Sequence, residues 1–144
     1  MSTPTAPVLH HLMTIRFQTS RTLSEGHPEG TRYLLQVDGG VFELHPPANA
    51  PDGPTQGRVL HGADWVVQHQ DGSLELDVRA QLEAADGTVV LMSYSGSSVG
   101  GAVRSTPRFS TPVVGPLSWL NGLVCLAEGT IGQGGVTYEV WAAQ

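Results

Sequence analysis

Short runs of alternating apolar and polar residues, separated by glycine and proline, make up most of the chain. Apolar residues recur at every second position in these runs, which is the period of a half-buried β-strand. No stretch keeps the 3.6-residue period of an amphipathic helix, and 18 glycines and 10 prolines would interrupt one almost everywhere. Many short strands with turn residues between them are typical of a sandwich or barrel. The sequence therefore predicts an all-β protein.

The same pattern predicts where strands and irregular segments lie. Outside the middle of the chain, strands are expected at Leu12–Thr19, Arg32–Val37, Val41–His45, Leu120–Gly129 and Val136–Ala142. Loops or breaks are expected at Ser20–Thr31, His45–Gly57, Ser95–Ala102 and Pro107–Pro116, with a turn at Asp38–Gly40. A length of 144 residues fits one domain, so we expect a flexible segment over residues 1–11 and one domain over residues 12–144.

Two Asp-Gly pairs, Asp71-Gly72 and Asp86-Gly87, predict tight hairpins in the middle of the chain. Asp-Gly is preferred in two-residue type I′ turns, and a loop of that length fixes which residues face each other. In this register Asp64 faces Arg79, and Arg79 faces Tyr94. Directly opposed strand residues have Cβ atoms about 5 Å apart, so these three side chains would form one row across three strands.

Alternation in this register gives the three strands two different faces. One is a core face, made of Trp65, Val67, Leu74, Leu76, Val78, Ala80, Leu82 and Leu91. The other mixes apolar and charged residues, namely Asp64, Val66, Gln68, Asp77, Arg79, Gln81, Met92, Tyr94 and Gly96. A mixed face suits an amphipathic ligand cavity or a subunit interface.

The row has the side chains of an acid–base site. Arg79 can bind a carboxylate or stabilise a developing oxyanion, and Tyr94 can act as an acid. Asp64 or Asp77 can serve as a base, or can orient Arg79. The alternative is structural, because cross-strand ion pairs between Arg and Asp are common.

Composition excludes several other classes of function. Every basic residue is arginine, which rules out Schiff-base chemistry on lysine, and a net charge of −6 without a basic run disfavours nucleic acid and anionic membranes as partners. The first residues lack the pattern of a signal peptide, and no apolar run approaches the length of about 20 residues of a membrane helix. Cys125 lies in an apolar run and is expected to be a small buried residue. None of the six histidines has metal-ligand spacing. We expect a cytoplasmic protein without metal or cofactor.

Several short motifs resemble one known family. They are Gly57–Leu60, Gly62–Trp65, Leu76–Arg79, Asp86-Gly87, the pair Tyr94 and Gly96, Thr106–Phe109 and Trp119–Asn121. In order and spacing they are similar to the domain of unknown function 3237 family, also called uncharacterised protein family 0311, roughly from Leu12 to Ala142. The chain departs from the family pattern at His61, at Ser110 and in a longer Pro46–Pro54 segment, which indicates a remodelled pocket mouth.

The resemblance implies a small closed antiparallel β-barrel of about eight strands that self-associates and whose activity is generally unestablished. Its architecture is similar to barrels that hold small apolar ligands, including the allene oxide cyclase (calycin-like) type. The resemblance marks Glu43, Asp64, Trp65, Asp77, Arg79, Tyr94, Trp119 and Asn121 as family-pattern positions.

Together these observations predict a cofactor-independent isomerase, cyclase or lyase that acts on a small, largely apolar oxygenated metabolite inside the barrel. The expected catalytic residues are Arg79, Tyr94, Asp64 and Asp77, and the expected ligand-binding residues are Trp65, Glu43, Met92, Trp119 and Asn121. Two alternatives remain, a non-catalytic ligand-binding barrel and an oligomerisation barrel without a ligand. The expected partners are a small molecule and further copies of the chain.

Overall fold

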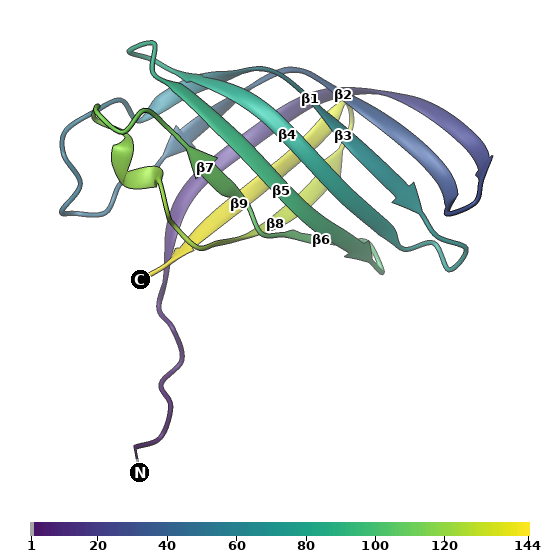
Figure 1. Cartoon of the computed structure of the whole chain (residues 1–144), viewed down its shortest axis with the longest axis horizontal. Helices are drawn as coiled ribbons and strands as arrows, with labels where there is room; N and C mark the ends of the chain where they lie inside the picture. Colours follow the sequence, from purple (N-terminus) through teal and green to yellow (C-terminus); the bar gives the residue numbers. More distant parts are fainter. Residues whose placement is uncertain (1) are drawn as a thin grey trace.

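One antiparallel sheet closes on itself as a barrel in the computed structural model, which describes residues 2–144 (Figure 1). Its strands are β1 (Leu9–His27), β2 (Gly30–Leu44), β3 (Gln56–Gln68), β4 (Leu74–Ala84), β5 (Val89–Val99), β6 (Ala102–Ser105), β7 (Arg108–Ser110), β8 (Cys125–Gly132) and β9 (Gly135–Ala143). A single 3₁₀ turn, η1 (Ser118–Leu120), is the one helical element of the described residues, and none of their helices is long and apolar enough to cross a membrane.

The strand order explains how the barrel closes. Neighbours follow the order β4-β3-β2-β1-β9-β8-β6-β5, and β4 also pairs with β5. β6 pairs with the end of β5 and β7 with its start, so these two short strands share one position. Eight positions therefore make a closed barrel, as the sequence predicts. Closure pairs the long strands on both sides, and only the three-residue strand β7 has a partner strand on one side alone among the described residues.

The two ends of the barrel are filled differently. Both chain termini, the β2–β3 loop, the β4–β5 turn and η1 gather at one end (Figure 1). Fully buried apolar side chains close that end, among them Leu12, Met13, Leu44, Leu82, Val90, Leu117 and Leu120, and Cys125 is buried with them as expected. The β1–β2, β3–β4, β5–β6 and β8–β9 turns surround the other end, which is the end that can open to a ligand.

The first hairpin is longer than the sequence predicts. Ser20–Thr31 is not a loop, because β1 continues to His27, β2 starts at Gly30, and the two strands stay paired, with Arg21 opposite Leu35. The segment extends beyond the core, so its strand lacks the apolar alternation that marks the others. The barrel also includes residues 9–11, since β1 begins at Leu9 rather than at residue 12.

Two further expected breaks lie inside strands. Asp38–Gly40 is a β-bulge rather than a turn, because Gln18 pairs with Gly39 and Thr19 with Val37. A Cβ on Gly40, whose φ is 144°, would overlap the carbonyl oxygen of Arg16, so only glycine fits this close approach. β5 runs through Ser95 to Val99 and turns only at Gly100-Gly101.

The remaining loop predictions have mixed outcomes. The Pro-rich segment expected at 45–57 does connect β2 to β3 as a loop. Within the irregular segment expected at 107–116, residues Arg108–Ser110 form the short strand β7. The strand expected from Leu120 begins only at Cys125, because η1 and a turn take up the residues before it.

The two Asp-Gly hairpins each contain one residue more than a type I′ turn. The Gly72 N–H donates to the His69 carbonyl at 3.0 Å, and the Gly87 N–H donates to the Ala84 carbonyl at 2.9 Å. Both glycines have a left-handed φ, 87° and 89°, which is the three-residue loop of a type I turn followed by a glycine bulge. The predicted register is therefore wrong by one residue at each hairpin.

Gly87→Ala should destabilise the protein by about 1–2 kcal/mol, because an L side chain is strained at this φ while nothing lies within 4 Å of the added Cβ. Gly87→Asn should cost less, because asparagine tolerates the left-handed region. Urea unfolding of the two variants measures the difference. Gly132→Ala, with open space and no left-handed φ, is the matched control. Equal stability of the Gly87→Ala and Gly132→Ala variants would contradict the turn assignment.

Candidate active site in the open end of the barrel

The expected row Asp64–Arg79–Tyr94 does not exist. The actual pairing of the strands is shifted by one residue, so Arg79 lies on the opposite face of the sheet from Asp64 and Tyr94. Asp64 faces Val78, and Arg79 faces Ala63 on one side and Ser93 on the other. Asp64 and Tyr94 therefore point into the barrel and are buried, whereas Asp77 and Arg79 are exposed on its outer surface. The residues of the expected core face do not all lie inside the barrel. Those on β4 do point inward, as expected, but Trp65 on β3 and Leu91 on β5 are exposed.

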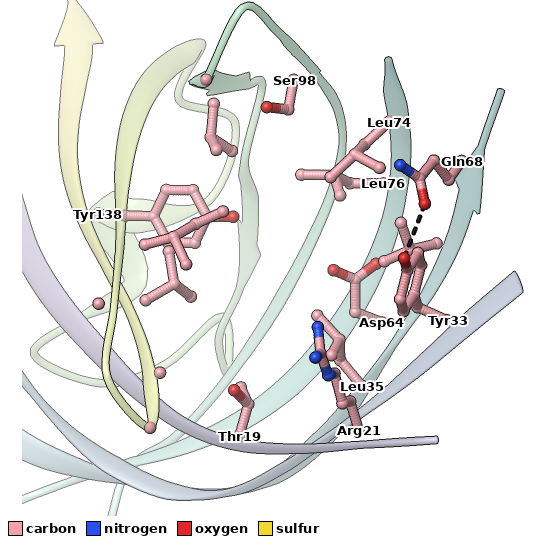
Figure 2. A pocket seen from close by; sticks show the side chains of 18 of the residues that line it. Thr19, Arg21, Tyr33, Leu35, Asp64, Gln68, Leu74, Leu76, Ser98 and Tyr138 are labelled. Carbon is pink, nitrogen blue, oxygen red and sulfur yellow. Dashed lines mark hydrogen bonds between the residues drawn. The ribbon is translucent and has the colours of Figure 1, made fainter. Parts of the chain in front are cut away.

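A cavity of about 590 Å³ occupies the open end of the barrel (Figure 2). Its size is that of a pocket for one small organic molecule. Seven apolar side chains line the cavity, namely Leu35, Val66, Leu74, Leu76, Val103, Ile131 and Val136. Eight polar side chains also line it, namely Thr19, Ser20, Arg21, Tyr33, Asp64, Gln68, Ser98 and Tyr138. Glycines of three turns edge the mouth, where they add no side chain that would cover it.

Asp64 on β3 is the carboxyl group of this cavity, and only 7% of it is exposed. It points inward by strand alternation, two residues before the buried Val66. Its Oδ1 accepts a hydrogen bond from the backbone N–H of Asp77 at 3.1 Å. No arginine or histidine of residues 2–144 forms an ion pair with it.

Burial raises the pKa of Asp64 to about 7. The hydrogen bond from Asp77 opposes this shift, and the negative charge of Asp77 adds to it. A carboxyl with a pKa near 7 is present in both protonation states at neutral pH. It can therefore remove a proton from one atom of a ligand and return it to another.

Two buried tyrosines lie near Asp64, and one of them, Tyr138, lines the cavity. Figure 2 shows the hydroxyl of Tyr138, on β9, directed across the cavity toward the Asp64 carboxyl. The ring of Tyr94, on β5, lies 5.2 Å from the Tyr138 ring in an edge-on arrangement. Burial raises the pKa of Tyr138 to about 12 and the pKa of Tyr94 well above its usual 10, and the charge of Asp64 contributes to both shifts. Both phenols therefore stay protonated and are hydrogen-bond donors at neutral pH.

The rim of the cavity carries two more polar contacts. The hydroxyl of Tyr33, on β2, donates to Oε1 of Gln68, on β3, at 2.7 Å. The guanidinium carbon of Arg21 lies 5.8 Å from the centre of the Tyr33 ring, which places a positive charge over an aromatic face. Arg21 thus reaches the cavity from the part of β1 that extends beyond the core.

None of the five expected ligand-binding residues lines this cavity. Glu43 and Trp65 lie on the outer surface, and 55% of Trp65 is exposed. Met92 is packed in the apolar core. Trp119 belongs to η1 at the filled end, and Asn121 has a structural role there, because its side chain accepts from the Thr111 N–H at 2.8 Å and donates to the Thr111 carbonyl at 3.0 Å.

Sequence reasoning missed seven polar residues of the cavity, among them Arg21, Tyr33, Gln68 and Tyr138. Tyr138 could have been predicted, because alternation in the expected strand Val136–Ala142 puts its side chain on the same face as Val136 and Val140. Gln68 was assigned to the mixed face but without a role. Arg21 could not have been predicted as a cavity residue. The polar pattern of Ser20–Thr31 predicts a loop, and a loop does not indicate which way its side chains point.

Metal binding has no support in the geometry of the described part of the chain. Across residues 2–144, no group of three or more His, Cys, Asp and Glu side chains is placed to hold an ion.

Comparison with known families identifies the chain. Residues 7–143 match the family described as "Protein of unknown function (DUF3237)". The chain belongs to this family. The match spans nearly the whole barrel, in agreement with the resemblance of the short motifs. Among proteins with curated descriptions, none matches this DUF3237 chain significantly.

Solved structures share the barrel of this DUF3237 protein at low sequence identity. A conserved protein of unknown function from Rhodopseudomonas palustris is 22% identical, covers 99% of this chain and 100% of its own, and gives a TM-score of 0.83. A beta-barrel like protein from Acinetobacter baumannii is also 22% identical, covers 100% of both chains and gives a TM-score of 0.81. A protein from Penicillium herquei described as an enzyme is 20% identical, covers 100% of this chain and 99% of its own, and gives a TM-score of 0.73. At these identities the likeness establishes the fold alone.

Proposed function

We propose that this DUF3237 protein is a cofactor-independent enzyme that isomerises, cyclises or eliminates within a small, largely apolar oxygenated molecule held in the barrel cavity. The observation that carries the proposal is the buried Asp64 carboxyl, without an ion-pair partner among the described residues and with a pKa of about 7. A carboxyl tuned to neutral pH in an apolar cavity is typical of an acid–base catalyst. The description of the Penicillium herquei barrel as an enzyme lends support from the same fold.

The proposed step needs no oxidant or reductant. Asp64 removes a proton from a carbon next to a carbonyl group of the ligand, and the electron pair moves to the carbonyl oxygen as an enolate. Tyr138 donates a hydrogen bond to that oxygen, and the Tyr94 ring packs edge-on against the Tyr138 ring and so helps to hold it in place. Protonated Asp64 then returns the proton to a second carbon, to an oxygen that leaves with the electrons of its C–O bond, or to the alkoxide that forms when the enolate carbon attacks a second carbonyl group of the same molecule.

Arg79 has no part in this mechanism, because it lies on the outer surface of the barrel. The oxyanion role that the sequence assigned to it passes to Tyr138. Asp77 contributes only its backbone N–H, which orients Asp64.

Deuterium exchange tests the proposal without knowledge of the natural substrate. Phenylacetone, an apolar ketone with acidic C–H bonds, is incubated in D₂O with the protein, and proton NMR follows the loss of its C–H signals. Wild-type protein should accelerate the exchange, and Asp64→Asn should reduce the acceleration by a factor of about 100 or more. Glu43→Gln, which removes an exposed carboxyl from the outer surface, should leave it unchanged.

The second candidate function is a non-catalytic binding protein that uses the same cavity. If phenylacetone and related ketones bind with saturable NMR line broadening and exchange no faster than in buffer, this second candidate replaces the enzyme proposal. Exchange that is accelerated equally by wild-type protein and by Asp64→Asn would also remove Asp64 from its role.

A further inference from the structure

Arg21 is the second charged residue of the cavity wall, and its charge is not used by the proposed reaction. Among the residues that line the cavity, Arg21 and Asp64 alone carry charged side chains. Arg21 is exposed at the mouth, whereas Asp64 is only 7% exposed, and both side chains are drawn on the same side of the cavity in Figure 2. The natural ligand therefore meets a positive charge on entry and an ionisable carboxyl inside.

The Arg21 guanidinium has no carboxylate partner among residues 2–144. Three of the seven arginines do have one, because Arg32 pairs with Glu29, Arg58 with Glu83 and Arg104 with Glu128. Of the other four, Arg21 alone lines this cavity. Arg21 instead lies over the Tyr33 ring, at 5.8 Å from its centre. In a chain with net charge −6, an arginine that faces a cavity without an acidic partner is available to a ligand.

Arg21 does not form an ion pair with Asp64, although both residues line the same cavity. No N···O distance of 4.0 Å or less joins them, and Arg21 is absent from the causes that set the pKa of Asp64. Leu35 stands beside Arg21 on the wall below Asp64 (Figure 2). The two charges thus act on different parts of a bound molecule.

We propose that the ligand of this cavity is an amphipathic monoanion, with an apolar body inside the barrel and an oxyanion group, such as a carboxylate, bound by Arg21 at the mouth. This inference rests on the proposed function and names its substrate class. Arginine presents its donors as a planar fork that matches an oxyanion in two hydrogen bonds. The Tyr33 face holds the guanidinium at the rim, and the apolar wall fits the rest of the molecule.

A pair of fluorescent probes with the same aromatic body tests this inference. Anilinonaphthalene sulfonate carries one anionic group, and N-phenylnaphthylamine lacks it. Wild-type protein should bind the sulfonate more tightly than the neutral probe. Arg21→Gln should raise the Kd of the sulfonate about tenfold, the effect of one lost charged hydrogen bond, and should change the Kd of the neutral probe by less than about twofold.

Arg16→Gln is the matched control, because Arg16 lies on the same strand, faces outward and is exposed. It should change neither Kd. Three results would overturn the inference: wild-type protein without preference for the sulfonate, Arg21→Gln binding both probes as wild type does, or Arg21→Gln weakening both probes equally, which would make Arg21 a packing residue.

The probe experiment is independent of catalysis. Deuterium exchange is followed with wild-type protein and phenylacetone, which carries no anionic group, so it does not depend on oxyanion binding by Arg21. Wild-type protein that shows no sulfonate preference but intact exchange therefore contradicts the substrate class and leaves the proposed function standing. Wild-type protein that prefers the sulfonate but does not accelerate exchange contradicts the proposed function and leaves the substrate class standing.

Discussion

Asp64→Asn is expected to make the protein more stable above neutral pH, by up to about 4 kcal/mol, although it removes the proposed catalytic group. The native pKa of Asp64 is about 7, against 3.8 for an unperturbed aspartate, a difference of about three units at about 1.4 kcal/mol each. Between these pH values the unfolded chain has released its proton and the native protein has kept it. The free energy of unfolding therefore falls as pH rises from about 4 to about 7, and then stays low.

The asparagine variant should lack this fall, because its side chain cannot ionise and its Oδ1 can still accept from the Asp77 N–H. Urea unfolding at pH 4.5 and at pH 8 measures the effect as the difference between variant and wild type. That difference should be small at the lower pH and largest at the higher one. Glu43→Gln removes an equal charge from the outer surface, and Glu43 is not among the groups that shift the pKa of Asp64, so this variant should give nearly the same small difference at both pH values. A variant–wild-type difference for Asp64→Asn that does not change with pH would mean that Asp64 is not desolvated.

A stability gain of this kind bears on function as well as on folding. A buried carboxyl that is not paired costs free energy at neutral pH, and an amide of the same shape would remove most of the cost. Residues that lower stability in this way are concentrated at active sites, where the shifted pKa is needed. Greater stability together with lost deuterium exchange in one variant would be the expected mark of a catalytic Asp64.

The sequence predicted the barrel correctly but misplaced the site by one residue at each of two turns. Asp-Gly fits the last two residues of a three-residue loop as well as a two-residue turn. The longer loop is favoured here by Asp71 and Asp86, whose Oδ1 atoms accept from the N–H groups of Ser73 and Thr88 at 2.9 Å each. The residue that follows each Asp-Gly pair, Ser73 or Thr88, was therefore the signal in the sequence that could have indicated the observed register.

Hydrophobic alternation did not correct the error, because β3 is ambiguous. Trp65, Val66 and Val67 are three consecutive apolar residues, so either Val66 or its two neighbours can supply the buried face. The structure buries Val66 inside the barrel and leaves Trp65 outside. Asp64 therefore turns inward with Val66, away from the row that would have paired it with Arg79.

The family resemblance indicated the fold correctly, but most of the positions that it marked do not lie in the cavity. The fold depends on many positions, and the order of the motifs along the chain was sufficient for it. Of the eight family-pattern positions, Asp64 alone lines the cavity, whereas Asn121 and Trp119 shape the filled end. A motif position can thus stabilise the barrel, and its presence does not assign chemistry.

Phe17→Ala should destabilise the protein by about 3–5 kcal/mol, the range of a large aromatic side chain removed from a packed core. Phe17 is 1% exposed and lies beneath the cavity, with its ring 6.5 Å from the Tyr94 ring and 6.0 Å from the Tyr138 ring. Alanine would remove the ring and leave a void between the two tyrosines and the filled end. Phe17→Leu keeps most of the volume and should cost less than about 1.5 kcal/mol. Urea unfolding at one pH measures both, and Val41→Ala, on the exposed face of β2, should stay within about 0.5 kcal/mol of wild type.

The same two variants also connect packing to the proposed chemistry. Tyr138 can stabilise an enolate only if its hydroxyl is held toward Asp64, and the Phe17 ring is one of the two aromatic surfaces against which the Tyr138 ring packs. Deuterium exchange should therefore fall in Phe17→Ala, measured where the variant is fully folded, and should be largely kept in Phe17→Leu. If exchange per folded molecule is the same in Phe17→Ala as in wild type, the position of Tyr138 does not limit the reaction, and Asp64 acts without it.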